Sequence, residues 1–544
     1  MPYSVGAQLR WIRKLLKGHY GWLWGYMGLE ILSLLLGLSF VYWSKRAVDI
    51  ATGNTPGVLR PVIYYMIASI ALGILSGQWA AWLNGRIKIR MMVRLQNSLV
   101  FSQMRTMWEN TKRWHTGDLL VRMTTDTQEV VQMATTTFPD LCVTGVRLLA
   151  SWGFLWIMDP LLAGMILAIS PLFIFSRLYY RKMRRLNREV KDMESNLGIV
   201  LQENLKQRLL IRALGVSHVR KEKYEKVQTA IELLKKRLLR FSVFTQLLLK
   251  FAFNGGYLLA FMWGVYRLHT DIISFGTLTA FLQLVGRIQV PVLTIIAFVP
   301  AAIRCRTASE RLMELYEGER EEEVEPLRIE PIESLSLNSL AFRYEEQKII
   351  DRLTAVLSPG IPVAVVGATG KGKTTLIRLL LALVKPEEGE LALWTNGRKV
   401  GLTPRTRINF SYVPQGNTLF SGTVRENLLI AAPSASGERL KEVLELACAE
   451  FVYALPQGLD TKIGEGGRGL SEGQSQRIAI ARALLHESGV WLLDEATSAL
   501  DAATADRLIA NLLCAGRNKI LIFVTHDSRL MAVCPQTIRL DGLK

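Results

Sequence analysis

Two patterns of hydrophobic and polar positions divide the chain near residue 316. Before that point, apolar residues run on for about 20 positions at a time, the length that a helix needs to cross the hydrocarbon core of a bilayer. Six such stretches with few charges predict six membrane-spanning helices, at residues 22–43, 62–83, 139–157, 161–180, 241–268 and 275–295. After that point, short β-branched segments alternate with helical ones, which predicts an α/β domain.

The connections between the predicted spans indicate how the apolar half is oriented. Three connections are short, whereas residues 84–138 and 181–240 form long connections rich in Lys and Arg. Because cytoplasmic loops carry an excess of positive charge, we expect the N-terminus and both long connections on that side. Apolar residues recur at helical spacing within the long connections, so we expect the membrane helices to continue into the cytoplasm.

The positive charge of the chain is concentrated in its apolar half. Residues 1–316 hold 40 Lys and Arg against 18 Asp and Glu, the remainder holds 26 against 29, and the formal net charge is +19. Basic residues beside membrane spans face anionic lipid, so we predict a lipid membrane as partner and no nucleic acid. An acidic run and two prolines predict a linker. The expected organisation is a transmembrane domain at 1–316, a linker at 317–331 and a second domain at 332–544.

A glycine-rich motif follows a short buried strand in the second domain. Residues 362–366 read Pro-Val-Ala-Val-Val, and residues 367–375 read Gly-Ala-Thr-Gly-Lys-Gly-Lys-Thr-Thr before an apolar helix. This is the phosphate-binding pattern G-x-x-x-x-G-K-[ST] between a strand and a helix. We expect Lys373 to reach the β- and γ-phosphates of ATP and Thr374 to hold Mg²⁺. The candidate nucleotide-binding residues here are Gly367, Gly370, Gly372, Lys373, Thr374 and Thr375.

A second buried strand ends in two adjacent carboxylates, Asp494 and Glu495. Asp494 suits Mg²⁺, directly or through water, and Glu495 suits polarising a water molecule that attacks a phosphate. Acids at the end of a strand are a weak signal alone. Together with the phosphate-binding loop, they predict ATP hydrolysis.

Further short motifs follow in a fixed order between residues 336 and 544. They are Val-Pro-Gln ending at Gln415, Leu-Ser-Glu-Gly-Gln at 470–474, Ser-Ala-Leu-Asp ending at Asp501 and Val-Thr-His ending at His526. In this order they resemble the Q-loop, signature, D-loop and switch histidine of the ATP-binding cassette transporters. Residues 463–468 resemble the X-loop of the exporter branch, and looser matches at 116–126 and 308–312 extend the resemblance into the apolar half.

The resemblance assigns roles to residues of this sequence. Tyr344 stands where the family stacks an aromatic ring on adenine. The signature and D-loop add Ser471, Gly473, Gln474 and Asp501 as nucleotide-binding residues. The catalytic residues implied are Glu495, His526 and Gln415, and the metal-binding residues implied are Thr374, Gln415 and Asp494.

The resemblance also implies a fold and a mechanism. The fold is an all-α transmembrane domain of six helices joined to an α/β nucleotide-binding domain of the P-loop type. Two such domains close head-to-tail over two ATP molecules, each held by Lys373, Asp494 and Glu495 of one chain and by the signature loop of the other. Hydrolysis then drives export of a hydrophobic or amphipathic substrate by alternating access.

Two residues depart from the family pattern. Lys371 stands where a small residue is usual, and Glu472 stands where the signature usually has glycine. Asymmetric heterodimers of the family contain altered signatures, so the partner is either a second copy, which we favour, or a different half-transporter chain. A non-transporting, ATP-gated channel or regulator is the alternative to transport, and the intact Glu495 favours turnover over static binding.

Several ionisable residues lie inside the predicted spans, including Glu30, Arg147, Lys250 and Arg287. Such residues are candidates for function because charge is costly in a bilayer. Arg147 and Arg287 could line a cavity for an anionic or amphipathic substrate, and interhelical pairing is the alternative that we favour. The substrate is unidentified. The short outer loops suit a multi-pass protein of a bacterial inner membrane with its nucleotide-binding domain in the cytoplasm.

Overall fold

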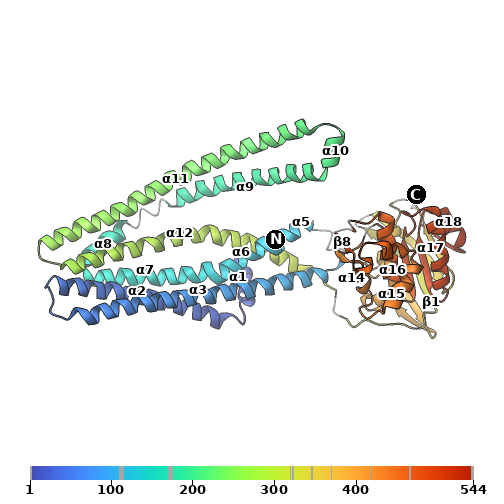
Figure 1. Cartoon of the computed structure of the whole chain (residues 1–544), viewed down its shortest axis with the longest axis horizontal. Helices are drawn as coiled ribbons and strands as arrows, with labels where there is room; N and C mark the ends of the chain where they lie inside the picture. The colour runs from blue at the N-terminus through green and yellow to red at the C-terminus, as the bar shows by residue number, and fades with distance from the viewer. Residues whose placement is uncertain are drawn as a thin grey trace. The chain divides into compact units, whose positions relative to one another are not determined.

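The chain forms two compact units in a computed structural model (Figure 1). The structure describes residues 3–108, 116–169, 176–318, 320–321, 324–344, 347–368, 370–416, 418–464, 467 and 469–540. The first unit comprises Met1–Phe101 and Thr116–Glu317, and the second comprises Ser102–His115 and Gly318–Lys544. The segment Ser102–His115 therefore belongs to the unit that contains the nucleotide motifs.

The first unit is helical. Its helices are α1 (Val5–Leu15), α2 (Tyr20–Ala51), α3 (Leu59–Met104), α5 (Thr116–Val121), α6 (Thr127–Gln132), α7 (Phe138–Met158), α8 (Pro160–Ile169), α9 (Ser176–Lys206), α10 (Arg208–Ala213), α11 (Ser217–His269) and α12 (Phe275–Glu317). The π-helical turns η1 (Arg122–Asp126) and η2 (Met133–Thr137) join α5, α6 and α7 end to end. Each predicted span falls within these helices, except that residues 170–175 of the fourth lie outside the described residues.

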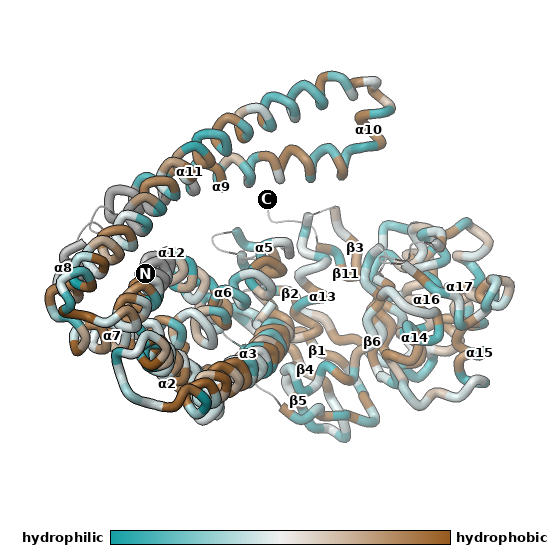
Figure 2. The backbone as a smooth tube through the Cα atoms, turned by 60° about the vertical axis from the view of Figure 1, so that its left-hand side comes forward, coloured by the Kyte–Doolittle hydropathy of each residue, from teal (hydrophilic) through white to brown (hydrophobic). Residues whose placement is uncertain are grey.

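Three described helices are long and apolar enough to cross a membrane. They are Tyr20–Ala51, Leu59–Met104 and Gly117–Met158, and a shorter apolar stretch covers Phe275–Ile288 at the start of α12. Figure 2 shows hydrophobic residues along α2 and α3, whereas α9 and the facing part of α11 mix polar and apolar positions. The long helices α9 and α11 pack side by side and are joined by α10, as predicted for spans that continue beyond the membrane (Figure 1).

The second unit contains two main β-sheets. The antiparallel sheet has the order β2-β1-β4-β5, with β1 (Ser334–Tyr344), β2 (Gln347–Leu357), β4 (Glu388–Thr395) and β5 (Arg398–Gly401). The parallel sheet has the order β11-β3-β10-β9-β6, with β3 (Val363–Val366), β6 (Phe410–Val413), β9 (Val490–Asp494), β10 (Ile520–Val524) and β11 (Gln536–Arg539). A small pair, β7 (Gly422–Thr423) and β8 (Lys462–Ile463), lies apart.

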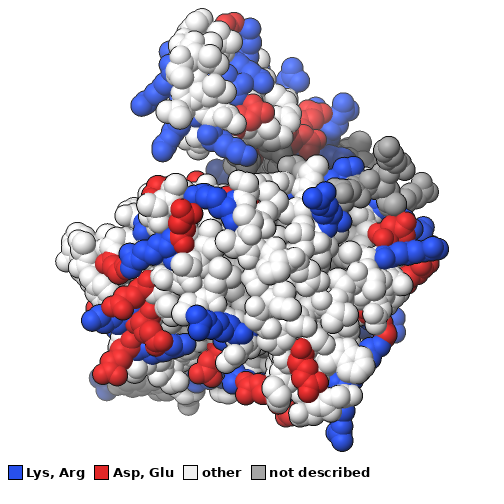
Figure 3. Space-filling view, turned by 90° about the vertical axis from the view of Figure 1, so that its right-hand side faces the viewer, with Lys and Arg blue, Asp and Glu red and all other residues white. Residues whose placement is uncertain are grey.

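Helices cover the parallel sheet. They are α13 (Lys373–Leu380), α14 (Val424–Leu429), α15 (Gly437–Leu446), α16 (Glu472–Leu485), α17 (Ala502–Ala515) and α18 (Ser528–Val533). The predicted fold, a helical domain followed by an α/β domain, is confirmed. On the face shown in Figure 3, the Lys and Arg side chains of this unit are interspersed with Asp and Glu.

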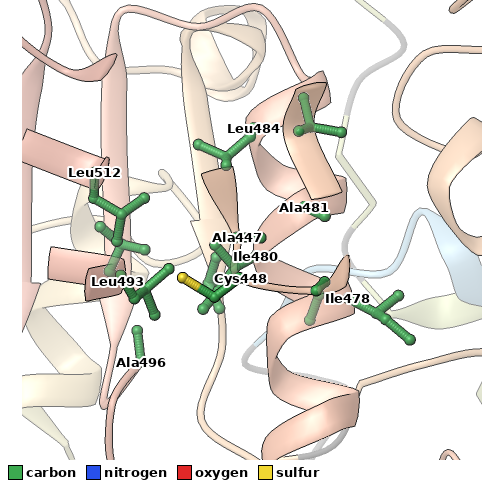
Figure 4. Packing of buried hydrophobic residues seen from close by; sticks show 14 of the residues in the cluster. Ala447, Cys448, Ile478, Ile480, Ala481, Leu484, Leu493, Ala496 and Leu512 are labelled. Atoms are coloured by element: carbon green, nitrogen blue, oxygen red, sulfur yellow. The ribbon is translucent and has the colours of Figure 1, made fainter. Parts of the chain in front are cut away.

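The central strands β9 and β10 of the parallel sheet are buried on both faces. In β9, Val490 and Leu492 belong to a core shared with the antiparallel sheet, whereas Trp491 and Leu493 belong to a core shared with α14–α17. Figure 4 shows Leu493 in this second core beside Cys448 and Leu512. Because successive side chains of a strand point to opposite faces, this continuous apolar run fixes β9 between two layers. The carboxyl end of the strand, with its two acids, is thereby held in place.

Candidate nucleotide-binding and hydrolysis site

The predicted motifs meet at one edge of the parallel sheet. The neighbouring strands β3, β10, β9 and β6 all run parallel, so their carboxyl ends lie at the same edge. The phosphate-binding loop follows β3, His526 follows β10, Glu495 follows β9 and Gln415 follows β6. Ligands of open α/β sheets bind outside the carboxyl ends of the strands, and this edge is therefore the candidate site.

The phosphate-binding loop needs glycine for steric reasons. Gly370 and Gly372 have φ angles of +82° and +94°, in the left-handed region that favours glycine. A Cβ atom on Gly367 would come within 2.7 Å of the Leu540 carbonyl oxygen, and one on Gly372 within 2.9 Å of Ile349 Cγ2. Helix α13 begins directly after the loop, at Lys373, so its N-terminus adds positive potential to the site.

Two residues of the predicted site, Lys373 and His526, lie together. Lys373 Nζ donates a hydrogen bond of 2.7 Å to the Gly367 carbonyl oxygen and also contacts His526 Nε2. Thr374 is exposed at the start of α13, whereas Thr375 is buried. Lys371 is exposed, and nothing in the structure explains why a lysine stands there.

The two acids at the end of β9 have different surroundings. Asp494 is only 7% exposed. Its burial and the neighbouring Glu495 raise the pKa of Asp494 to about 6, while Lys373 acts in the opposite direction. Glu495 has a φ angle of +50°, uncommon for a residue other than glycine, and its N–H donates to the Val524 carbonyl oxygen at 2.8 Å. Strained backbone of this kind is typical of functional sites.

The Glu495 side chain is surrounded by predicted site residues. Gln415 Nε2 donates a hydrogen bond of 2.6 Å to Glu495 Oε2, and His526 Nε2 lies 3.9 Å from Glu495 Oε1. Gln476 Nε2, from α16, donates to the Glu495 carbonyl oxygen at 2.7 Å. Gln476 is not among the residues predicted for the site. It is only 3% exposed beside the signature, and its position two residues after Leu-Ser-Glu-Gly-Gln is the one sequence feature that sets it apart.

The signature residues form the start of α16. The Ser471 hydroxyl accepts a hydrogen bond of 3.2 Å from the Gln474 N–H, and the Ser471 N–H donates to Gln474 Oε1 at 2.9 Å. This reciprocal capping box fixes the first turn of the helix. Gly473 packs against the D-loop, because a Cβ atom there would come within 2.5 Å of the Ala499 carbonyl oxygen. Glu472 is exposed in this first turn.

The remaining predicted residues are placed as follows. Asp501 is exposed and caps α17 by accepting from the Thr504 N–H at 3.0 Å. Tyr344 ends β1, and its hydroxyl accepts a hydrogen bond of 3.0 Å from Arg378 Nη1. Within the described part of the chain, Ser471, Gly473 and Asp501 make no hydrogen bond to Lys373 or His526. Residues 465, 466 and 468 of the predicted X-loop lie outside the described residues.

The two intramembrane arginines differ in their contacts. Arg147 Nη2 lies 3.8 Å from Glu30 Oε2, a loose ion pair between α7 and α2. The Arg287 guanidinium of α12 lies against α2 at Gly37, where a Cβ atom would come within 2.5 Å of Arg287 Nη1. Within the described residues, no carboxylate lies at ion-pair distance from Arg287. Pairing therefore accounts in part for Arg147 but not for Arg287.

Comparisons with known proteins agree with the resemblance seen in the motifs. A family model described as "ABC transporter transmembrane region" matches residues 23–292, and one described as "ABC transporter" matches residues 350–498. A probable ABC transporter ATP-binding/permease protein of Haemophilus influenzae is 29% identical over 326 residues, which cover 59% of this chain and 58% of that protein. An ATP-dependent lipid A-core flippase of Vibrio cholerae is 24% identical over 497 residues, which cover 89% of this chain and 84% of that protein.

The fold is also found in a solved structure. A bacterial Atm1-family ABC exporter with ATP bound superposes with a TM-score of 0.79, covering 96% of this chain and 94% of that chain at 20% sequence identity. The two family models cover most of the helical unit and the strand ends that carry Lys373, Gln415 and Glu495. The chain is thus an ATP-binding cassette transporter of the exporter type, with membrane and ATP-binding domains fused in one polypeptide and ATP hydrolysis coupled to transport.

Proposed function

We propose that this chain exports an amphipathic substrate across a membrane by alternating access, driven by ATP hydrolysis between two copies of the chain. The observation that carries the proposal is the convergence of Lys373, His526, Glu495 and Gln415 at the carboxyl ends of four adjacent parallel strands. Hydrogen-bond donors for a γ-phosphate and a carboxylate for the attacking water thus share one site. This combination favours turnover over gating by bound nucleotide alone.

The residues present fit MgATP. The Asp494 carboxylate, the Thr374 hydroxyl and the Gln415 amide oxygen are hard oxygen donors of the type that Mg²⁺ prefers. When bound, the metal supplies charge neutralisation at the β- and γ-phosphates. Tyr344 offers an aromatic face for adenine, and the turn from Gly367 to Gly372 directs backbone N–H groups toward the phosphates.

Hydrolysis then depends mainly on position and charge. Glu495 orients a water molecule in line with the γ-phosphate and draws off its proton. Lys373 and His526 stabilise the negative charge that spreads over the γ-phosphate oxygens. Gln415 holds the Glu495 carboxylate in place through the 2.6 Å hydrogen bond between their side chains. The γ-phosphate also needs donors on its open side, which we assign to a second chain.

The signature supports this assignment. Ser471 and Gly473 start α16 and make no hydrogen bond to the phosphate-binding residues of their own chain within the described part of the structure. We therefore place the N-terminus of α16 from one copy over the phosphate-binding loop of the other. A heterodimer is the alternative, because Glu472 would bring an acid near the triphosphate. Full ATPase activity of a singly expressed chain would exclude a required heterologous partner.

The substrate is proposed to be an amphipath with an anionic group. Arg287 lies against Gly37 of α2 and has no carboxylate at ion-pair distance within the described residues. A charge held in this way inside a membrane bundle is costly unless it serves a substrate or a partner helix. Arg287→Ala and Arg147→Ala should lower substrate-stimulated ATPase activity and leave the basal rate unchanged. Equal loss of both rates would indicate a purely structural role.

The location is proposed to be a bacterial inner membrane, with the nucleotide-binding domain in the cytoplasm. The positive loops and the bacterial relatives support this orientation. Cys514 on α17 is an exposed thiol, and its labelling shows on which side of the membrane the nucleotide-binding domain lies. A membrane-impermeant maleimide should label Cys514 in inside-out vesicles and not in intact cells, with Cys514→Ser as the control. Labelling in intact cells would contradict the orientation.

Transport itself is tested in proteoliposomes. The purified chain should move a labelled anionic amphipath, such as a fluorescent phospholipid, in an ATP-dependent way, and Glu495→Gln should abolish that movement. ATP hydrolysis without movement of lipid, peptide or drug probes would favour the regulator alternative.

A further inference from the structure

We propose that Arg378 is a positioning residue that sets Tyr344 for the adenine base and connects the base to the segment after α3. Arg378 lies in the last turn of α13, the helix that begins at Lys373 of the phosphate-binding loop. The inference rests on the adenine-binding role given to Tyr344 above. It adds a residue that neither the sequence motifs nor the family resemblance assigned.

One side of Arg378 holds the tyrosine. Arg378 Nη1 donates a hydrogen bond of 3.0 Å to the Tyr344 hydroxyl. The Tyr344 ring also meets Phe342 edge-on, with ring centroids 4.8 Å apart and an interplanar angle of 85°. The phenol is therefore restrained at its hydroxyl by Arg378 and at its ring by Phe342.

The other contact of Arg378 is with Trp108. The Arg378 guanidinium carbon lies 5.5 Å from the centroid of the Trp108 ring, within the range of a cation–π interaction. Trp108 follows the end of α3 and belongs to the same compact unit as α13. Within the described residues, no carboxylate pairs with Arg378. No ion pair in the described part of the chain therefore holds the Arg378 guanidinium in place, and a displacement of Tyr344 would move Arg378 relative to the Trp108 indole ring.

The end of α13 is attached to the same region by a second route. Arg407 donates to the carbonyl oxygens of Leu381 and Ala382, at 2.8 and 3.0 Å, and holds Glu321 through two hydrogen bonds of 3.0 and 2.9 Å. The Glu321 N–H in turn donates to the Arg105 carbonyl oxygen at 2.8 Å. Residues 102–108 are thus linked to the phosphate end of the site through α13 and to the base end through Arg378.

These contacts give Arg378 a role that depends on the base. Phosphate binding acts on the N-terminus of α13, and base binding acts on Tyr344 and then on Arg378. Only a ligand that has a base engages the second route. Comparison of ATP with inorganic tripolyphosphate, which has phosphates and no base, therefore separates the two routes.

The first test measures the affinities of the full chain in lipid for ATP and for tripolyphosphate. All variants carry Glu495→Gln, which prevents ATP hydrolysis. Arg378→Met and Tyr344→Phe should each weaken ATP binding about 2- to 10-fold, the usual cost of one lost hydrogen bond, and leave tripolyphosphate binding unchanged. The double variant should bind ATP as tightly as the single variant with the lower ATP affinity, because both substitutions remove the same contact. Arg439→Met, which removes a surface ion pair with Glu442 on α15, is the matched control.

Equal weakening of ATP and tripolyphosphate by Arg378→Met would overturn the proposal, because Arg378 would then only support α13. Tyr344→Ala provides the separate check on the proposed site. If Tyr344→Ala does not change the ratio of the two affinities, the adenine-binding role of Tyr344 is wrong. If Tyr344→Ala changes that ratio and Arg378→Met does not, Tyr344 binds the base and the Arg378 inference fails.

The second test follows the connection to Trp108 by hydrogen exchange. ATP should slow amide exchange in residues 102–108 as well as in residues 367–375. In Arg378→Met, ATP should still protect 367–375 but protect 102–108 at least twofold less. Tripolyphosphate on the unchanged chain should give the same reduced pattern. Undiminished protection of 102–108 in Arg378→Met would overturn the connection.

Discussion

The side-chain amide of Gln415 donates a 2.6 Å hydrogen bond to the Glu495 carboxylate. The two residues follow β6 and β9, which are neighbours in the parallel sheet. A donor at this position orients the carboxylate and stabilises its charge. The contact therefore joins the residue proposed to sense the metal to the residue proposed to activate water.

Gln415→Leu removes this donor with little change in side-chain volume. We expect the kcat for ATP hydrolysis to fall about tenfold or more, because a catalytic group that loses its orientation loses rate steeply. The measurement is steady-state ATPase activity at saturating ATP over a range of Mg²⁺ concentrations. An unchanged kcat with a higher Mg²⁺ requirement would show that the metal contact, and not the contact with Glu495, is what matters.

Asp494→Asn should stabilise the nucleotide-free, metal-free chain above about pH 6. The pKa of Asp494 is raised to about 6 in the folded state by burial and by Glu495, against an ordinary value of 3.8. The folded state therefore favours the protonated acid, and the stability that this contributes at low pH is lost as pH rises through 6. The asparagine variant avoids that loss.

Melting of the full chain in EDTA at two pH values measures this effect. We expect Asp494→Asn to melt a few degrees higher than the unchanged chain at pH 8, with the difference shrinking at pH 5. Asp506→Asn, which alters an exposed carboxylate on α17 near Arg529, should show no such pH dependence. A variant that melts lower at pH 8 would contradict the account of the Asp494 environment.

Glu472→Gln should increase ATP hydrolysis, because it removes an exposed negative charge from the first turn of the helix that we place over the γ-phosphate of the partner. The same change should lower the free energy of unfolding by about 0.3–1 kcal/mol, since acids favour helix N-termini. A lower rate of ATP hydrolysis in Glu472→Gln would contradict the proposed placement of α16.

Gly473→Val should abolish ATP hydrolysis and spare ATP binding, because its side chain would collide with the Ala499 carbonyl oxygen. ATPase and nucleotide-binding assays, made in parallel, separate an effect on hydrolysis from an effect on binding.

Much of the fold could be predicted because two periodicities are strong in this sequence. Continuous apolar runs predict the membrane helices, and the buried strand before Gly367 predicts β3 with the loop at its carboxyl end. The strand order could not be predicted, because β10, which pairs with β3, and β9, which pairs with β10, both lie far from β3 in sequence. The meeting of His526, Glu495 and Gln415 depends on that order.

Other contacts have no local signal at all. Gln476 and Arg378 occupy ordinary helical positions in sequence, and only the packing of α16 and α13 shows that they touch Glu495 and Tyr344. The positive φ angle of Glu495 also has no local signal, because glycine is the residue usually found at positive φ. The surrounding structure must therefore hold Glu495 in this conformation. Long-range hydrogen bonds of this kind are what the structure adds to the motifs.

We propose above that one type of chain, paired with itself, hydrolyses ATP at this site. The most direct test is the ATPase activity of the purified chain reconstituted in lipid, alone and as Glu495→Gln. We expect activity that rises more than linearly with chain concentration in the dimerisation range and falls at least 100-fold in Glu495→Gln, with ATP binding retained. A folded, ATP-binding chain that shows no hydrolysis on its own, or activity that survives Glu495→Gln, would contradict it.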